Sequence, residues 1–80
     1  MAELDTIDEL LGALNAVEDP SCALLLEHLE SARFYGSGAM PLEYRMSLAM
    51  AREQLYCLSD RPLRARASDF IRRELSAVVS

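Results

Sequence analysis

Apolar residues recur at helical spacing along most of this chain, which predicts helices and no strand. Thr6 and Glu9 form a capping pair that predicts the start of a first helix, and Asp19-Pro20 predicts its end and the start of a second. The second helix is expected to end near Tyr35. The apolar positions of the first helix are Ile7, Leu10, Leu11, Leu14 and Val17. Those of the second are Cys22, Leu25, Leu26, Leu29 and Ala32.

The main reversal of the chain is predicted at Gly36-Ser37-Gly38, and Pro41 then opens a third helix that is expected to run to Leu58. The stretch from Ser59 to Pro62 ends this helix and starts a fourth. The apolar face of the fourth helix is Leu63, Ala67, Phe70, Ile71, Leu75 and Val78. The pattern predicts a single all-α domain over residues 1–80, a helical hairpin elaborated to a small three- or four-helix bundle.

The third helix is apolar on two opposite sides. The continuous stripe is Tyr44, Leu48, Ala51, Leu55 and Leu58. The opposite stripe is Leu42, Met46, Ala49 and Tyr56, and it is interrupted by Glu53 and flanked by Met50. A helix with two apolar stripes must be covered from both sides, so either it is the centre of a bundle or one stripe belongs to a partner protein.

The interrupted stripe is the better candidate for the partner. Methionine is flexible and suits a surface that repacks on binding, and a charged residue within the stripe suits an interface better than a sealed core. The predicted partner-binding residues are Leu42, Met46, Ala49, Met50 and Tyr56. The alternative that the fourth helix covers this stripe stays open.

Composition is consistent with a small folded domain that depends on a partner. With 80 residues and 51% hydrophobic residues, the chain is too apolar for disorder but forms only a small core, so alone it is expected to be marginally stable or self-associated. No apolar run approaches the ~20 residues of a membrane span, and the acidic start does not resemble a secretory signal. A cytoplasmic location is expected.

Charge is unevenly distributed along the chain. Residues 1–32 hold eight acids and no base, whereas residues 33–80 hold eight Arg against five acids, so the two parts carry −8 and +3 and together give the net charge of −5. The exclusive use of Arg is interpreted as a trace of a GC-rich genome, and an acidic arm is expected to lie beside a basic one. Net acidity argues against nucleic acid as a partner.

Candidate catalytic and metal-binding residues are few. Cys22, Cys57 and His28 are too few and too scattered for a structural zinc site, and both cysteines occupy apolar helical positions, which favours buried free thiols. A disulfide across a helical hairpin is geometrically possible, but without a secretory signal it is not expected. No nucleophile–base pair is recognisable, so we expect no enzyme activity, no cofactor and no metal.

Three features resemble the YscE-type small co-chaperones of type III secretion. The first is the acidic, leucine-rich opening from Leu4 to Leu11, and the second is the run from Ala23 to Ala32 before a glycine-containing turn. The third is Pro41-Leu42-Glu43-Tyr44, which matches a Pro-x-x-Tyr start of the second arm and is followed by Ala51, Glu53 and Gln54. The resemblance covers residues 4–58.

This resemblance implies a helical hairpin without activity of its own. Such proteins bind and stabilise a second, tetratricopeptide-like chaperone, and the pair keeps the needle subunit soluble before export. Two features depart from the family pattern: Asp19-Pro20 interrupts the first arm, and residues 61–80 add a helix. Other classes also stay open, namely a phage- or plasmid-borne acidic inhibitor or antitoxin that acts by protein binding.

Overall fold

The computed structural model describes residues 4–79, and over these residues it contains four α-helices, two short 3₁₀ helices and no strand. The elements in chain order are α1 (Ile7–Val17), η1 (Pro20–Cys22), α2 (Ala23–Ser37), α3 (Pro41–Glu53), η2 (Leu55–Cys57) and α4 (Arg61–Val79). The predicted all-α class is confirmed.

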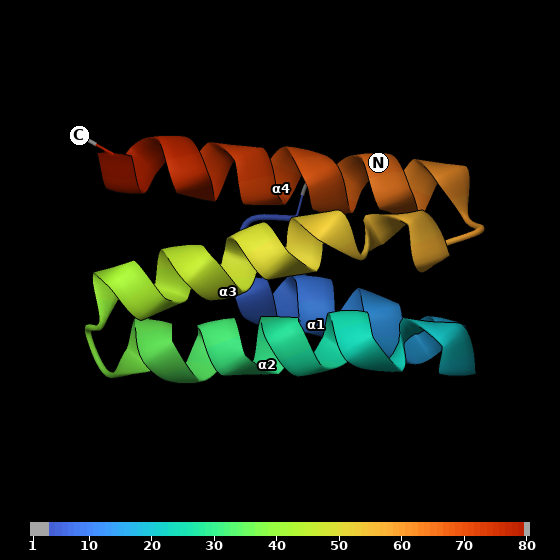
Figure 1. The fold of residues 1–80 in the computed structure, drawn as a ribbon. Coiled ribbons are helices and arrows are strands. Elements are labelled where there is room, and N and C mark those ends of the chain that lie inside the picture. Colours follow the sequence, from blue (N-terminus) through green and yellow to red (C-terminus); the bar gives the residue numbers. More distant parts are fainter. Residues whose placement is uncertain (1–3, 80) are drawn as a thin grey trace.

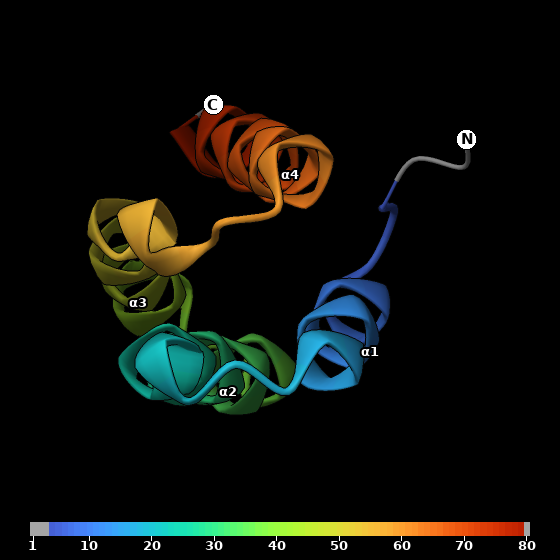
Figure 2. The same ribbon diagram turned by 90° about the vertical axis from the view of Figure 1, so that its right-hand side faces the viewer.

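The helices α2, α3 and α4 lie side by side and alternate in direction (Figure 1). Seen along the helices, the four form an arc with α1 beside α2 at one end and α4 at the other (Figure 2). Residues 4–6 lead from α1 toward α4, and Leu4 is only 4% exposed. Because Arg73 Nη2 donates to the Leu4 carbonyl oxygen at 2.8 Å, this segment ties the two ends of the arc together.

The predicted capping residues are confirmed at both N-terminal segments. The Glu9 backbone N–H donates to Thr6 Oγ1 at 3.1 Å, and the Thr6 hydroxyl donates to the Glu9 carboxylate at 3.2 Å. Asp19 Oδ1 accepts from the Ser21 backbone N–H at 3.0 Å and from its hydroxyl at 2.8 Å. Asp19 therefore caps the next segment as predicted, but that segment opens with the 3₁₀ turn η1 before α2 begins.

The chain reverses between Ser37 and Pro41, close to the predicted break. The residue with positive φ there is Ala39, at 55°, although glycines stand just before it. Gly36 has a different role, because a Cβ at this position would lie 3.3 Å from the ring of Tyr44. The lack of a side chain at Gly36 therefore lets α3 approach the end of α2 closely.

The core confirms most of the predicted apolar faces. Its buried hydrophobic residues are Leu4, Leu10, Leu11, Leu14, Cys22, Leu25, Leu29, Ala32, Leu48, Ala51, Leu55, Leu58, Leu63, Ala67, Phe70 and Ile71. Ile7, Leu26, Tyr44 and Leu75 pack against this core and are partly buried. Val17 was predicted to face inward and is 38% exposed, and the side chain of Val78 lies outside the described residues.

The predicted end of the third helix at Leu58 is wrong, because α3 ends at Glu53. The Gln54 backbone N–H donates to the Ala51 carbonyl oxygen at 2.9 Å, an i to i−3 bond that tightens the chain into η2. In a 3₁₀ turn, residues three apart point to the same side, so Leu55 and Leu58 both remain buried.

Candidate protein-binding surface

The helix α3 lies between α2 and α4 (Figure 1). One of its sides is buried and the opposite side is exposed. On the buried side, Leu48 and Ala51 are both 0% exposed, as predicted for the continuous stripe. On the opposite side, Leu42 is 64%, Met46 is 56% and Met50 is 50% exposed. These three residues, spaced four apart and joined by Ala49, are here called the outer face of α3.

Two of the five predicted partner-binding residues, Ala49 and Tyr56, do not belong to the exposed row of Leu42, Met46 and Met50. Ala49 is partly buried and lies toward α4. Tyr56 is 75% exposed but belongs to η2, so it does not continue the line of Leu42, Met46 and Ala49 as a helix running to residue 58 would require. The structure therefore brings four of the residues together on α3 and places Tyr56 beyond the end of that helix.

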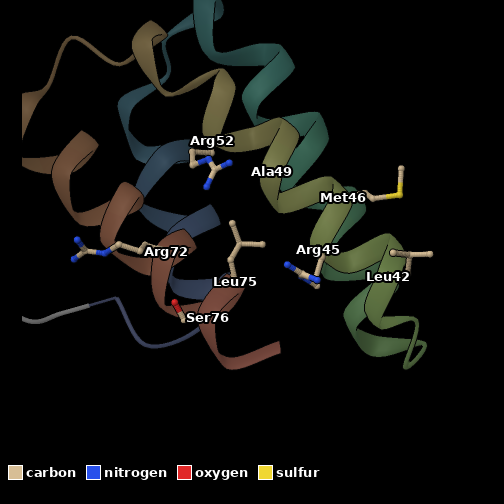
Figure 3. Close-up of a pocket in the computed structure, with 8 residues that line it drawn as sticks. All are labelled: Leu42, Arg45, Met46, Ala49, Arg52, Arg72, Leu75 and Ser76. Carbon is tan, nitrogen blue, oxygen red and sulfur yellow. The ribbon is translucent and has the colours of Figure 1, made fainter. Parts of the chain in front are cut away.

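A shallow groove of about 450 Å³ runs between α3 and α4 beside the outer face of α3. The groove is lined by Leu42, Arg45, Met46, Ala49, Arg52, Arg72, Leu75 and Ser76. Figure 3 shows Arg45 and Arg52 on the side of α3 that faces α4, whereas Leu42 and Met46 point away from α4. Apolar side chains and guanidinium groups thus alternate across one surface.

The groove is positively charged in a chain whose net charge is −5. Three arginines line it and no acidic residue does. Arg72 is paired with Asp69 of the same helix at 2.5 Å, whereas Arg45 Nε is buried and meets no hydrogen-bond acceptor among the described residues. A guanidinium group binds carboxylates through two parallel hydrogen bonds, so these three arginines, Arg45, Arg52 and Arg72, suit acidic side chains of a partner; they are called the arginine rim below.

Sequence reasoning did not find this arginine rim. From the sequence, the exclusive use of Arg is interpreted as genome composition, and the basic residues 33–80 as an arm beside the acidic one. The signal that points to the rim is the position of Arg45 and Arg52, seven residues apart on α3, which places both on the same side of the helix. Without the packing of α4, that side could not be assigned to a groove.

A second exposed apolar position lies on α2. Phe34 is 71% exposed and makes an edge-on contact with the ring of Tyr35 at a centroid distance of 5.5 Å. It lines a depression between α1 and α2, together with Leu11 and Arg33, and not the groove beside α3. Phe34 is therefore an exposed apolar residue away from the outer face of α3, and substitutions at the two places can be compared in binding experiments.

A partly buried polar contact holds α3 to α4. The Tyr44 hydroxyl donates to Glu74 Oε1 at 2.5 Å. Burial raises the pKa of Tyr44 well above its usual value, and the hydrogen bond with Glu74 and the charge of its carboxylate raise it further. The phenol is thus protonated at neutral pH, and the pair is positioned to join the two helices that form the groove.

Among the ion pairs that the structure shows, one joins the acidic residues 1–32 to the Arg-rich residues 33–80. Arg33 pairs with Asp8 at 2.6 Å and joins α2 to α1, whereas Asp69 pairs with Arg72 and Arg73 within α4. Both partners of the first pair are more than half exposed, so it adds little to stability.

Two further properties concern residues 4–79, the part of the chain that the structure describes. Within that range, no group of three or more His, Cys, Asp and Glu side chains is arranged to hold a metal ion. None of the helices in the same range has both the length and the apolar character needed to cross a membrane.

Comparisons of the chain with protein-family models, with curated proteins and with solved structures found no match.

Proposed function

We propose that this chain is a non-catalytic type III secretion co-chaperone that binds a tetratricopeptide-like chaperone through the outer face of α3. In this role it stabilises that chaperone and helps to keep the needle subunit soluble before export, in the bacterial cytoplasm. The proposal combines the sequence resemblance of residues 4–58 with the surface properties of α3.

The observation that carries the proposal is the exposure of Leu42, Met46 and Met50 on a helix whose opposite side is sealed. Single exposed apolar residues are common on protein surfaces, but contiguous ones mark interaction sites more often. These three recur every four residues and therefore form one ridge along α3. A ridge of this kind packs well against a groove between two helices of a partner.

The added C-terminal helix is compatible with this interface. In a simple hairpin α4 would be absent, and a helix packed over α3 would have hidden the proposed face. Instead, α4 lies beside α3, and Leu42, Met46 and Met50 remain at least half exposed. Together with the arginine rim, α4 extends the apolar ridge into a surface that also suits carboxylates.

Co-expression tests the proposal directly. The chain is produced together with the tetratricopeptide-like chaperone and the needle subunit encoded in its native gene neighbourhood, and the complex is measured by size-exclusion chromatography. The double variant Met46→Asp/Met50→Asp places two carboxylates in the interface and is expected to abolish a micromolar complex, while the helical circular dichroism is kept.

Phe34→Asp is the matched control, because it charges a side chain that is at least as exposed but lies on the other side of the hairpin. This variant is expected to bind normally. Loss of binding by Phe34→Asp with normal binding by the Met variant would place the interface on α1 and α2. If no such chaperone binds the wild-type chain, the co-chaperone function is wrong and the inhibitor or antitoxin classes take its place.

A further inference from the structure

Two cysteines that lie far apart in the sequence meet at one end of the hairpin. The Cys57 thiol donates to Cys22 Sγ at 3.1 Å, across a separation of 35 positions. Both are free thiols, with Cys22 buried and Cys57 partly exposed. The expected free thiols are therefore present, and they also form a pair.

The register of the antiparallel helices explains why the two sulfur atoms meet. At the turn end, Gly36 of α2 lies against the ring of Tyr44 of α3. Cys22 precedes Gly36 by almost as many residues as Cys57 follows Tyr44, so the same register brings the two cysteines together at the opposite end. One lies in η1, which precedes α2, and the other lies in η2, which follows α3. These two segments form the end of the hairpin opposite its turn.

We propose that Cys22 and Cys57 form a reversible disulfide by exchange with a small disulfide of the glutathione type, closing the open end of the α2–α3 hairpin. A disulfide bond is about 2.05 Å long, so the sulfur atoms need to approach by only about 1 Å. We expect side-chain rotation to supply a movement of this size.

The exchange proceeds in two balanced steps. Cys57, the more exposed thiol, loses its proton to solvent, and its thiolate attacks one sulfur of the small disulfide. The S–S bond of the reagent breaks, a mixed disulfide forms on Cys57, and one thiolate leaves. Cys22 then loses its proton to solvent, and its thiolate attacks Cys57 Sγ; the mixed S–S bond breaks and the second thiolate of the reagent leaves. Two protein thiols are thus oxidised, and the small disulfide is reduced to two thiols once its thiolates take up protons.

The surroundings of the pair make this exchange slow and protect the reduced form at neutral pH. Burial raises the pKa of Cys57 to about 12, helped by the hydrogen bond to Cys22 and by the charges of Cys22 and Asp19. The thiolate is the attacking species, and only a small fraction of Cys57 is ionised near pH 7. The pair therefore responds to sustained oxidising conditions rather than to brief exposure.

The bond would change the unfolded state more than the folded one. It closes a loop that contains all of α2 and α3, which removes many conformations from the unfolded chain. Tyr56 precedes Cys57 in η2, so the bond also restrains this predicted partner-binding residue, which lies beyond the end of α3. This last consequence alone rests on the proposed function.

The test uses the full chain without a partner, so its result is independent of the proposed function. Reduced chain and chain oxidised in urea and then refolded are each equilibrated with mixtures of reduced and oxidised glutathione at a pH of about 8.5, which speeds exchange. Both samples are expected to converge on one monomeric species that is about 2 Da lighter than the dithiol, as loss of two hydrogens requires. That species is expected to melt at least about 10 °C above the reduced chain.

Cys57→Ser is the control, because it removes the partly exposed thiol and leaves the buried one in place. This variant is expected to show no internal disulfide and no rise in melting temperature under the same oxidation, with its fold checked by circular dichroism. The proposal is wrong if the oxidised wild-type chain melts below the reduced chain. Accumulation of glutathione adducts or of disulfide-linked dimers in place of the internal bond would also contradict it.

Discussion

The two sides of α3 can be compared by making the same substitution on each. Leu48 is 0% exposed and Leu42 is 64% exposed, and both lie on the same helix. Leu48→Ala removes a fully buried side chain and leaves a cavity, which costs about 2–5 kcal/mol in the free energy of unfolding. A fold of this size has a total stability of about 4–12 kcal/mol, so the loss is a large fraction of it.

Leu42→Ala is expected to cost much less. Full burial of a leucine side chain contributes about 1.5–3 kcal/mol, and only about a third of the Leu42 side chain is removed from water, so the loss is roughly 0.5–1 kcal/mol. Urea unfolding followed by circular dichroism measures both variants, and the dependence of stability on urea concentration is expected to stay unchanged.

The measurement is made at two protein concentrations, because self-association through the outer face of α3 would make the stability depend on concentration. A Leu42→Ala variant as unstable as Leu48→Ala at the lower concentration would refute the reasoning. It would mean that the outer face of α3 is covered within the monomer, and the proposed interface would lose its support.

Substitutions at three further positions test a contact between helices, a helix cap and a turn. Tyr44→Phe removes the hydrogen bond to Glu74 and is expected to cost about 1–2 kcal/mol in chemical unfolding at neutral pH. The pKa of Tyr44 is raised in the folded protein, so its contribution to the free energy of unfolding is fully present below the unfolded pKa of 10.0 and is lost as the pH rises above that value. The difference in stability between wild type and Tyr44→Phe is therefore expected to shrink above pH 10.0. Asp60→Ala removes the acceptor of the Leu63 backbone N–H, at 3.1 Å, and is expected to lower the melting temperature through a loss of about 1 kcal/mol, whereas Asp60→Asn is expected to restore most of it. Ala39→Gly relieves a positive φ of 55° and is expected to raise stability by up to about 1 kcal/mol; a loss would show that the left-handed turn is not strained.

Local sequence chemistry was enough to predict where the helices start. Thr6 and Asp19 cap their segments through side-chain contacts with residues two or three positions later, so no distant part of the chain is needed. Pro41 opens α3 for the same reason, since proline suits the first turn of a helix. The burial of Leu48 and Ala51 followed from periodicity, because a continuous apolar stripe has to face the core.

The end of α3 was not predictable in this way. A continuous helix to Leu58 and the observed break at Gln54 both leave Leu55 and Leu58 on the side of the core. The apolar pattern therefore does not distinguish them, and the position of Tyr56 depends on which one the packing selects. Residues that lie at such an ambiguous helix end cannot be assigned to a surface from spacing alone.

The sequence by itself determined the all-α class and the four helical segments, because these depend on contacts within a helix and on one apolar periodicity. That α4 leaves Leu42, Met46 and Met50 exposed was decided by the tertiary structure, since the sequence also allowed the fourth helix to cover this side of α3. Tertiary structure alone decided which side chains from different helices meet. The arginine rim of the groove requires α4 to lie beside α3, and the pairing of Cys22 with Cys57 requires the register of the whole hairpin. Both arise from packing between elements distant in the sequence, about which a pattern of spacings along one helix carries no information.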